Sequence, residues 1–215
     1  TYNLKIAAII PVKTFSLAKT RLSLSPKQKE EICEIMLEEI LYTLSISPQI
    51  FKTIIVTKEK RAIEIGRKYN VIIIIDNDEK NVNCAIALAD KYLLENKFDA
   101  SIVFPQDIPY IKTQDIDFIL NYKFPPNFAI VVPSRRFDGT NALVRMPINL
   151  MVTHYDEDSY KIHMNTAKEV TRNVALVFVK RIMLDVDNME DLEFLLQQNE
   201  KPEIAKKIKN IVDQK

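Results

Sequence analysis

Short apolar runs separated by helix-length amphipathic segments constrain the fold of this chain more than any other feature. The spacing of apolar residues between these runs predicts helices over residues 60–69 and 82–95, one that begins at Ser25-Pro26, and one that Thr113 caps. The unbroken apolar run 71–75 predicts a strand that is buried on both faces. Strands that alternate with helices predict an α/β fold with a sheet that is parallel in this half. The four predicted strands cover residues 4–10, 54–57, 71–75 and 100–104.

The second half of the chain has a different pattern. Apolar runs at 128–132 and 142–146 predict two strands joined through a turn at Gly139, which favours antiparallel or mixed pairing. A length of 215 residues fits one domain, 1–215, predicted as a three-layer α/β/α sandwich with a mixed, mostly parallel sheet. The remaining elements are predicted as a helix at 159–169, a strand at 174–179, an extended piece at 185–187, and helices at 189–197 and 202–215.

Composition excludes several classes of function. The chain has only two glycines, Gly66 and Gly139, and therefore no Gly-rich dinucleotide or P-loop motif. A formal net charge of +1 provides no global field for nucleic acid. The longest apolar run, 71–75, is too short to cross a membrane.

Two observations predict a cytoplasmic protein. Cys33 and Cys84 fall inside predicted helices without a metal-binding spacing, and we expect both to be reduced, buried thiols. The apolar run 6–10 lacks the charged leader and the cleavage site of a signal peptide.

Three aspartates stand where predicted strands end. An extended chain points residues i and i+2 to one face, so Asp185 and Asp187 could converge, with Asp107 as a third carboxylate. Such a set suits a divalent cation that is held mainly by phosphates. Two of them have a simpler interpretation: Asp107 as a turn residue, and Asp187 or Asn188 as a helix cap. Asp185 follows an apolar segment, where a carboxylate needs a partner.

Two basic segments are candidates for anion binding. The loop after the first strand carries Lys13, Lys19 and Arg21 without an acidic residue, and it either is a solvated loop or encloses a triphosphate. Arg135 and Arg136 precede the Gly139 turn, which is either a polar hairpin tip or a pocket for a small anionic acceptor. In such sheets ligands bind beyond the carboxyl ends of the strands, where strand order reverses.

The two histidines, His154 and His163, have no adjacent Ser or Cys nucleophile motif. Nucleophilic hydrolase chemistry therefore has little support. We expect both histidines to be packing or surface residues.

Four motifs in order resemble the 2-phospho-L-lactate guanylyltransferase family of coenzyme F-420 biosynthesis, over residues 4–196. They are Ile-Pro-Val-Lys…Ala-Lys-Thr-Arg-Leu-Ser, Pro-Gln-Asp-Ile-Pro, Asp-Gly-Thr-Asn-Ala-Leu and Leu-Asp-Val-Asp…Glu-Asp-Leu. The resemblance implies a nucleotide-diphospho-sugar-transferase-like fold, with GTP and a small phosphorylated carboxylic acid as substrates and Mg2+ as cofactor.

The resemblance also implies roles for individual residues. Thr140 and Ser159 match residues that contact the phosphorylated acid, and Arg135 or Arg136 is a further candidate for holding it. Asp107, Asp185 and Asp187 match the residues that hold Mg2+. The nucleotide-binding set is Pro11, Lys13, Lys19, Arg21, Asn83 and Asp107, of which Lys13, Lys19, Arg21 and Asp107 are the expected catalytic residues.

The chain departs from the family pattern at two places. The glycines that usually precede the position of Asn83 are absent. The sequence Asp156-Glu157-Asp158 precedes Ser159 where the family has a small, Gly-containing turn, and carboxylates there would repel an anionic acceptor unless they point away or meet a cation.

The expected reaction joins GTP and 2-phospho-L-lactate to give lactyl-2-diphosphoguanosine and pyrophosphate. Alternatives are transfer to phosphoenolpyruvate, 3-phosphoglycerate or a sugar phosphate, use of CTP, a glycosyltransferase with Asp185-Val-Asp187 as its Asp-X-Asp motif, and a non-catalytic nucleotide-binding protein. A homodimer is left open, because the basic helix 202–215 could pack on a partner or on the chain's own sheet.

Overall fold

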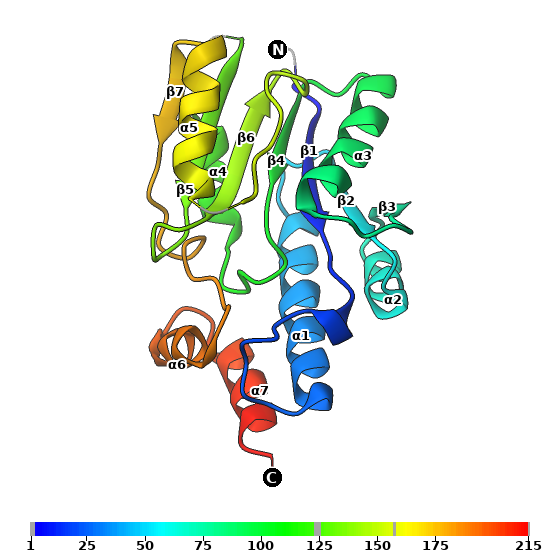
Figure 1. Cartoon of the computed structure of the whole chain (residues 1–215), viewed down its shortest axis with the longest axis vertical. Coiled ribbons are helices and arrows are strands. Elements are labelled where there is room, and N and C mark those ends of the chain that lie inside the picture. The colour runs from blue at the N-terminus through cyan, green and yellow to red at the C-terminus, as the bar shows by residue number, and fades with distance from the viewer. Residues whose placement is uncertain (1–2, 123–125, 157, 215) are drawn as a thin grey trace.

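Seven strands form one sheet in the order β3-β2-β1-β4-β6-β5-β7 (Figure 1). The computed structural model describes residues 3–122, 126–156 and 158–214. Only β6 is antiparallel to its neighbours, β4 and β5, among the described strands, and every other pairing is parallel. The strands are β1 (Ile6–Pro11), β2 (Lys52–Thr57), β3 (Ile72–Ile75), β4 (Ala100–Val103), β5 (Phe128–Pro133), β6 (Thr140–Met146) and β7 (Asn173–Leu176).

Helices cover both faces of this sheet, which confirms the predicted three-layer α/β/α architecture. Residues alternate along β1, so that Ala8 and Ile10 pack with α1, α2 and α4, while Ala7 and Ile9 pack with α3. α5 covers the same face as α3, over β5 and β7. The helices are the 3-10 helix η1 (Phe15–Leu17), α1 (Pro26–Ser45), α2 (Lys60–Lys68), α3 (Val82–Glu95), α4 (Thr113–Leu120), α5 (Ser159–Val170), α6 (Met189–Gln197) and α7 (Pro202–Val212).

The start of α1 follows from its sequence. The Gln28 amide donates to Ser25 Oγ at 3.2 Å, and the Ser25 amide donates to Gln28 Oε1 at 2.9 Å. This reciprocal capping box satisfies two backbone donors that the helix itself cannot satisfy. The predicted cap is confirmed.

Three local predictions are wrong. β3 is not buried on both faces, because it lies at the sheet edge and pairs only with β2, which leaves Ile75 49% exposed. Cys84 is exposed on α3, although Cys33 is buried as expected. The residue that caps α4 is Lys112, so Thr113 is already helical.

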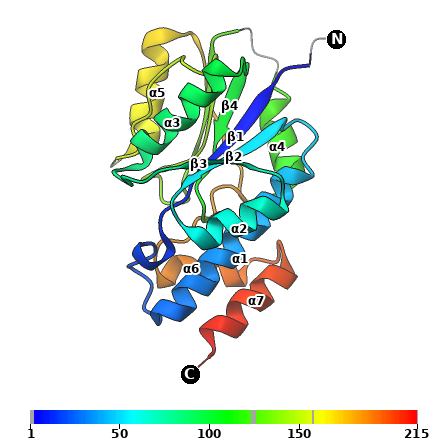
Figure 2. The same ribbon diagram turned by 90° about the vertical axis from the view of Figure 1, so that its right-hand side faces the viewer.

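α6 and α7 lie beyond the carboxyl ends of the parallel strands, beside the first half of α1 (Figure 2). Ile204, Ile208 and Ile211 of α7 are buried in a small core that also contains Ile32 and Met36 of α1. The C-terminal helix therefore packs on the chain's own α1 rather than on its sheet.

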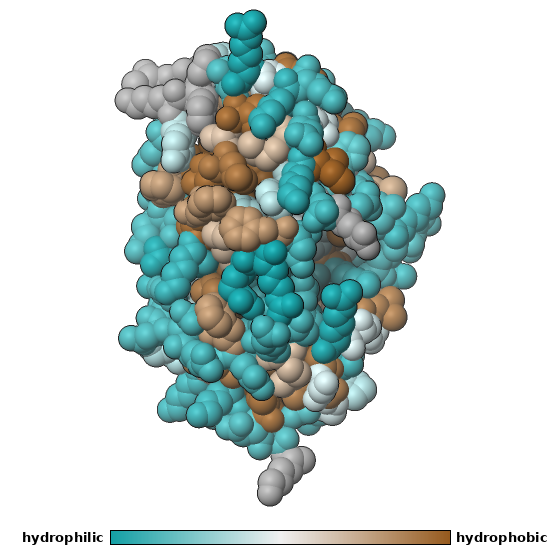
Figure 3. Space-filling model, turned by 60° about the vertical axis from the view of Figure 1, so that its left-hand side comes forward, coloured by the Kyte–Doolittle hydropathy of each residue, from teal (hydrophilic) through white to brown (hydrophobic). Residues whose placement is uncertain are grey.

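One side of the molecule exposes aromatic rings. Phe137 contacts both Tyr160 and Phe178 edge to face, with ring centroids 5.9 and 5.7 Å apart, and apolar surface interrupts the hydrophilic surface on this side (Figure 3).

None of the helices in the described ranges has the length and apolar character needed to span a bilayer. The homodimer stays a prediction.

Candidate active site

The sheet creates a crevice between the loops that follow β1 and β4. From β1 the chain passes to β2 and β3 on one side, and then returns to β4 on the other side of β1. The two loops therefore diverge at the point where strand order reverses, which is where open α/β sheets bind ligands. The Lys13 amide of the first loop donates to Gln106 Oε1 of the second at 2.8 Å. The reversal of strand order is at the predicted place, and binding of a ligand there stays a prediction.

Three carboxylates meet at this crevice. One oxygen from each of Asp107, Asp185 and Asp187 lies within 4.8 Å of the others. Asp107 follows β4 and is buried, Asp185 is partly buried, and Asp187 is exposed. Side chains that are about 80 residues apart along the chain thus form one acidic cluster, as the sequence predicted.

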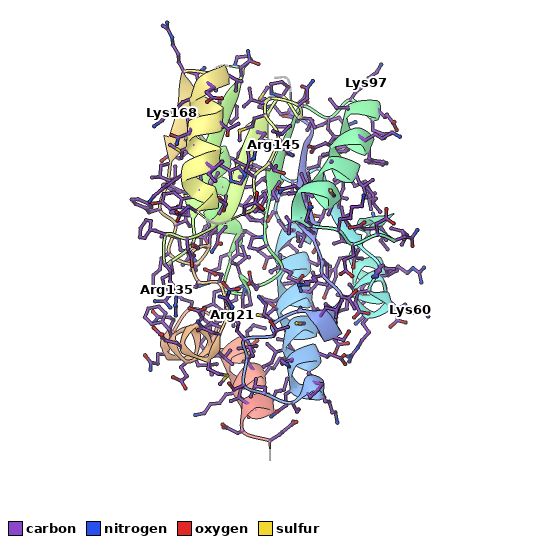
Figure 4. All side chains as sticks on the ribbon, viewed as in Figure 1. Arg21, Lys60, Lys97, Arg135, Arg145 and Lys168 are labelled. Atoms are coloured by element: carbon purple, nitrogen blue, oxygen red, sulfur yellow. The ribbon has the colours of Figure 1, made fainter. Side chains whose placement is uncertain are left out.

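Lys19 lies inside the acidic cluster. Its Nζ is 2.5 Å from Asp107 Oδ2 and 3.6 Å from Asp187 Oδ1, and its side chain is only 9% exposed. Its backbone is left-handed, with φ of 57°. In this structure Lys19 is therefore a buried counter-ion, whereas Lys13 and Arg21 are exposed. Figure 4 places Arg21 beyond the end of the sheet, near α1 and α6.

Burial and mutual repulsion shift the pKa values of the cluster. Burial raises the pKa of Asp107, and the ion pair with Lys19 offsets this only in part. Burial, followed by the charge of Asp107, raises the pKa of Asp185 to about 7. Burial lowers the pKa of Lys19, but the charges of Asp107 and Asp187 outweigh burial and leave it above its usual value. The raised pKa values show that the free cluster resists holding all of its carboxylates in the charged form, as expected for like charges brought together away from water.

The donor set fits a divalent cation. Asp107 Oδ1 is buried without a hydrogen-bond partner among the described residues, so it has a lone pair for an external ligand. Fully ionised, the three carboxylates and one ammonium would carry a formal charge of −2, which one Mg2+ would neutralise. Hard oxygen ligands are also what Mg2+ requires.

Neighbouring residues orient two of the carboxylates. Asn141 Nδ2 donates to Asp185 Oδ1 at 2.9 Å. The cap of α6 is Asn188, whose Oδ1 accepts from the Asp191 amide at 2.9 Å, so Asp187 does not cap the helix. Asp191 Oδ2 accepts from the Asp187 amide at 3.0 Å and fixes the turn. The side chain of Asp187 therefore stays available to the cluster.

Arg135 and Arg136 both bind α6. Their guanidiniums donate to Asp191 Oδ1 at 2.9 and 3.1 Å, and Arg136 also pairs with Glu190 at 3.2 Å. Arg135 lies over the ring of Phe194, 4.2 Å from its centroid. The arginines therefore tie the β5–β6 hairpin to α6, and their role in holding an acceptor stays a prediction without support from these contacts.

The crevice contains a cleft with two compartments. The inner compartment, about 310 Å3, is next to the acidic cluster and Thr140, and the outer compartment is about 270 Å3. Residues that line both are Pro11, Lys13, Val82, Gln106 and Tyr155. Pro11, Lys13, Lys19 and Asp107 of the predicted nucleotide site all reach the inner compartment. An apolar cavity of about 400 Å3 at the opposite end of the strands has no charged residue among its described lining, so it does not suit phosphates.

Asn83 supports the cleft from α3. Its Oδ1 accepts from Thr153 Oγ1 at 3.0 Å and from the Tyr155 amide at 2.8 Å. Asn83 therefore holds the loop that places Tyr155 in the cleft, and direct contact with a nucleotide stays a prediction.

Thr140 and Ser159 lie side by side, as the acceptor prediction requires. They are buried, and their hydroxyl oxygens are 3.0 Å apart. Asp158, which directly precedes Ser159, has a left-handed backbone with φ of 54° and an exposed side chain. Such a position favours glycine, which explains the glycine that the family has there, and aspartate tolerates it better than most residues.

Sequence analysis missed four residues of the site. Gln106 Nε2 and the Tyr155 hydroxyl are buried without a hydrogen-bond partner in the described part of the chain, and both residues line the cleft. Asn141 and Asp191 orient the carboxylates. Three of the four stand inside the quoted motifs, which was the available signal, whereas Tyr155 stands in none.

Comparison with known proteins assigns the family. The family model described as guanylyl transferase CofC like matches residues 6–213. The chain belongs to this family. Members of the CofC-like family are nucleotidyltransferases, so the chain is an enzyme of that class.

Relatives of this CofC-like chain differ in the acceptor for which they are named. A 2-phospho-L-lactate guanylyltransferase from Methanobrevibacter smithii is 29% identical, over 96% of this chain and 90% of its own length. A phosphoenolpyruvate guanylyltransferase from Conexibacter woesei is 27% identical, with coverage of 87% and 86%. A 3-phospho-D-glycerate guanylyltransferase from Colwellia psychrerythraea is 28% identical, with coverage of 87% and 89%.

Solved structures share the fold of the CofC-like chain. A Desulfovibrio desulfuricans protein, provisionally named a nucleotide-diphospho-sugar transferase, has a TM-score of 0.72 at 13% identity, with 97% of this chain and 98% of that chain covered. A 4-diphosphocytidyl-2C-methyl-D-erythritol synthase from Anaerococcus prevotii has a TM-score of 0.65 at 14% identity, with 91% and 97% covered. The predicted nucleotide-diphospho-sugar-transferase-like fold is confirmed.

Proposed function

We propose that this protein is a Mg2+-dependent guanylyltransferase that joins GTP and 2-phospho-L-lactate, giving lactyl-2-diphosphoguanosine and pyrophosphate in coenzyme F-420 biosynthesis. The observation that carries the proposal is the acidic cluster beside a cleft lined by Lys13, Lys19 and paired hydroxyls. Asp107, Asp185 and Asp187 would hold Mg2+, which supplies charge neutralisation for the phosphates.

The attacking group needs no general base. A phosphate monoester loses its second proton near pH 6, so the phosphate group of the acceptor is already a dianion at neutral pH. Its oxygen forms a bond to the α-phosphorus of GTP while the bond to the β-phosphate oxygen breaks, and pyrophosphate leaves with that electron pair. The protein contributes position and charge.

Basic side chains and hydrogen-bond donors of the chain would provide this positioning and this charge. Lys13, Lys19 and Arg21 would offset the charge that develops on the leaving pyrophosphate, and Pro11 and Asn83 would shape the nucleotide site. Thr140 and Ser159 would bind the phosphorylated acid. The buried donor on Gln106 points to an additional contact with an oxygen of one substrate.

The choice of 2-phospho-L-lactate rests on the resemblance and on the relative from Methanobrevibacter smithii. Relatives named for phosphoenolpyruvate and 3-phosphoglycerate are almost as similar, which keeps both acids as alternative acceptors.

An assay of four nucleoside triphosphates against these three acids, with pyrophosphate release as the readout, tests the proposal. We expect release with GTP and 2-phospho-L-lactate, and a loss of about 10²–10³-fold in kcat for Asp107→Asn. The matched control is Glu64→Gln on the exposed face of α2, which removes the same charge outside the site.

Each other outcome has a defined meaning. Release with a different acid overturns the acceptor, and release with CTP overturns the base. GTP binding by calorimetry without release from any pair would support a non-catalytic nucleotide-binding protein. Near wild-type turnover of Asp107→Asn at saturating Mg2+ would overturn the metal assignment.

A further inference from the structure

His163 ends a buried chain of hydrogen bonds that reaches the proposed acceptor site. It lies on α5 and is completely buried. Its Nδ1 is 2.9 Å from Thr140 Oγ1, which in turn is 3.0 Å from Ser159 Oγ. Thr140 lines the inner compartment of the cleft. The imidazole thus acts on the cleft through a hydroxyl and does not border it.

The other ring nitrogen determines the tautomer. The backbone amide of His154 lies 2.8 Å from His163 Nε2, and an amide N–H can only donate. Nε2 must therefore be the unprotonated nitrogen. Burial, together with the positive charges of His154 and Arg145, lowers the pKa of His163 to about 3, so the ring is neutral and its single proton is on Nδ1.

The tautomer of His163 determines how many hydrogens the chain of hydrogen bonds has available for a ligand. Nδ1 and the two hydroxyls carry three hydrogens, and the two contacts that link them use two. One hydroxyl hydrogen remains for a ligand. If Nδ1 lacked its proton, Thr140 would donate to it, Ser159 would donate to Thr140, and no hydrogen would remain.

We propose that His163 is a positioning residue that, by donating from Nδ1 to Thr140, turns one hydroxyl hydrogen of the Thr140–Ser159 pair toward an oxygen of the anionic acceptor. The inference rests on the proposed function, because it assigns the hydroxyl pair to the acceptor. It also gives a reason why an anion would bind near three carboxylates: a hydrogen with a fixed direction offsets part of their repulsion.

Two substitutions separate the two ring nitrogens. In His163→Asn the amide nitrogen takes the place of Nδ1 and preserves the donor to Thr140, but the tie to the His154 amide is lost. In His163→Gln the amide oxygen takes the place of Nε2 and preserves that tie, but the donor to Thr140 is lost. A purely structural role would depend on burial and on the hydrogen bond from the His154 amide. Such a role would not make His163→Gln, which keeps that hydrogen bond, the worse variant.

Steady-state kinetics of the wild type and both variants test the proposal, with 2-phospho-L-lactate and GTP varied separately. We expect His163→Gln to raise the acceptor KM by about ten-fold or more, as for the loss of one hydrogen bond to a charged group. His163→Asn should stay within about three-fold, and the KM for GTP should stay constant in both. Equal effects of the two variants, or an unchanged acceptor KM in His163→Gln, would overturn the inference.

A measurement on the wild type covers the case in which a variant does not fold. The chain has two histidines, so 15N spectra of histidine-labelled protein are assigned by comparison with His154→Asn. We expect a neutral Nδ1–H tautomer for His163 at pH 7, and an Nε2–H tautomer would overturn the inference. Absence of pyrophosphate release from the wild type with every acceptor would instead remove the proposed function, which the spectra do not depend on.

Discussion

Arg145–Asp90 and Lys19–Asp107 are two ion pairs of opposite design. Arg145 of β6 is completely buried, and it donates to both carboxylate oxygens of Asp90 at 2.7 and 2.9 Å and to the Met151 carbonyl at 3.2 Å. Both oxygens of Asp90 are used, and the pair fastens α3 to the sheet. Lys19 and Asp107 form a pair that leaves one carboxylate oxygen without a partner and places two more carboxylates beside it.

The difference separates an ion pair that stabilises the fold from an ion pair that is arranged for a ligand. The Arg145–Asp90 pair is charge-balanced, and Figure 4 shows Arg145 within the sheet. The Lys19–Asp107 pair is at the end of the sheet, where two further carboxylates crowd it. Groups arranged for a ligand are often unfavourable for the free protein, which is a common origin of trade-offs between stability and activity.

The largest expected effect comes from breaking the balanced pair. Asp90→Asn leaves the buried charge of Arg145 without a counter-ion, and we expect the free energy of unfolding to fall by about 3–5 kcal/mol. Urea denaturation measures it. The control Glu31→Gln breaks the exposed Lys27–Glu31 pair at 4.0 Å and should cost less than about 0.5 kcal/mol. Equal costs for the two variants would contradict this account of the Arg145–Asp90 pair.

The second largest expected effect is that of removing the metal, which should distinguish the Lys19–Asp107 pair from the Arg145–Asp90 pair. With GTP present, Mg2+ at about 100 times its Kd should stabilise the wild type by about 2.7 kcal/mol relative to EDTA, seen as a higher Tm. Asp185→Asn should lose this gain and should match or exceed the wild-type Tm in EDTA, because it relieves crowding of like charges.

The matched control for that experiment is Asp90→Asn. It should keep the Mg2+ gain from a lower starting Tm, since its carboxylate is outside the acidic cluster. Equal Mg2+ gains in Asp185→Asn and in the wild type would exclude Asp185 as a metal ligand.

Measured per pH unit, the smallest expected effect is a pH dependence near the balanced pair. Burial and nearby positive charge lower the pKa of His163 to about 3. His163 therefore stays neutral in the folded protein, while the unfolded chain takes up a proton on this side chain below about pH 6.5. The folded state therefore loses stability as pH falls from about 6.5 toward 3, by up to about 1.4 kcal/mol per pH unit.

Urea denaturation at several pH values measures this slope. His163→Asn should remove it, so that the stability difference from the wild type shrinks as pH falls, whereas His154→Asn should keep most of it. A constant difference between the wild type and His163→Asn from pH 7 to pH 4 would contradict the expectation.

Much of the fold followed from local sequence patterns. Periodicity and caps depend on neighbouring residues, so the start of α1, both ends of α3 and the presence of each strand of the sheet were predictable. The position of β3 at the edge was not, because strand order depends on long-range pairing, and an apolar run has the same pattern at an edge as in the centre.

The candidate site was predictable in part for the same reason. Motifs named the three aspartates and the basic loop, since their residue types suit phosphate and metal chemistry wherever they lie. Their convergence depended on long-range packing, and it holds although residues 185–187 lie in a loop.

The sequence by itself determined the family, the alternation of elements and the kinds of side chain available, because these depend on residue identity and on near neighbours. Tertiary structure decided which charges are paired. It assigned Arg135 and Arg136 to Asp191, placed Lys19 between carboxylates, and gave His163 one tautomer through a backbone amide nine residues away. Burial and hydrogen-bond partners determine the behaviour of a charged or polar group, and both exist only after the chain has folded.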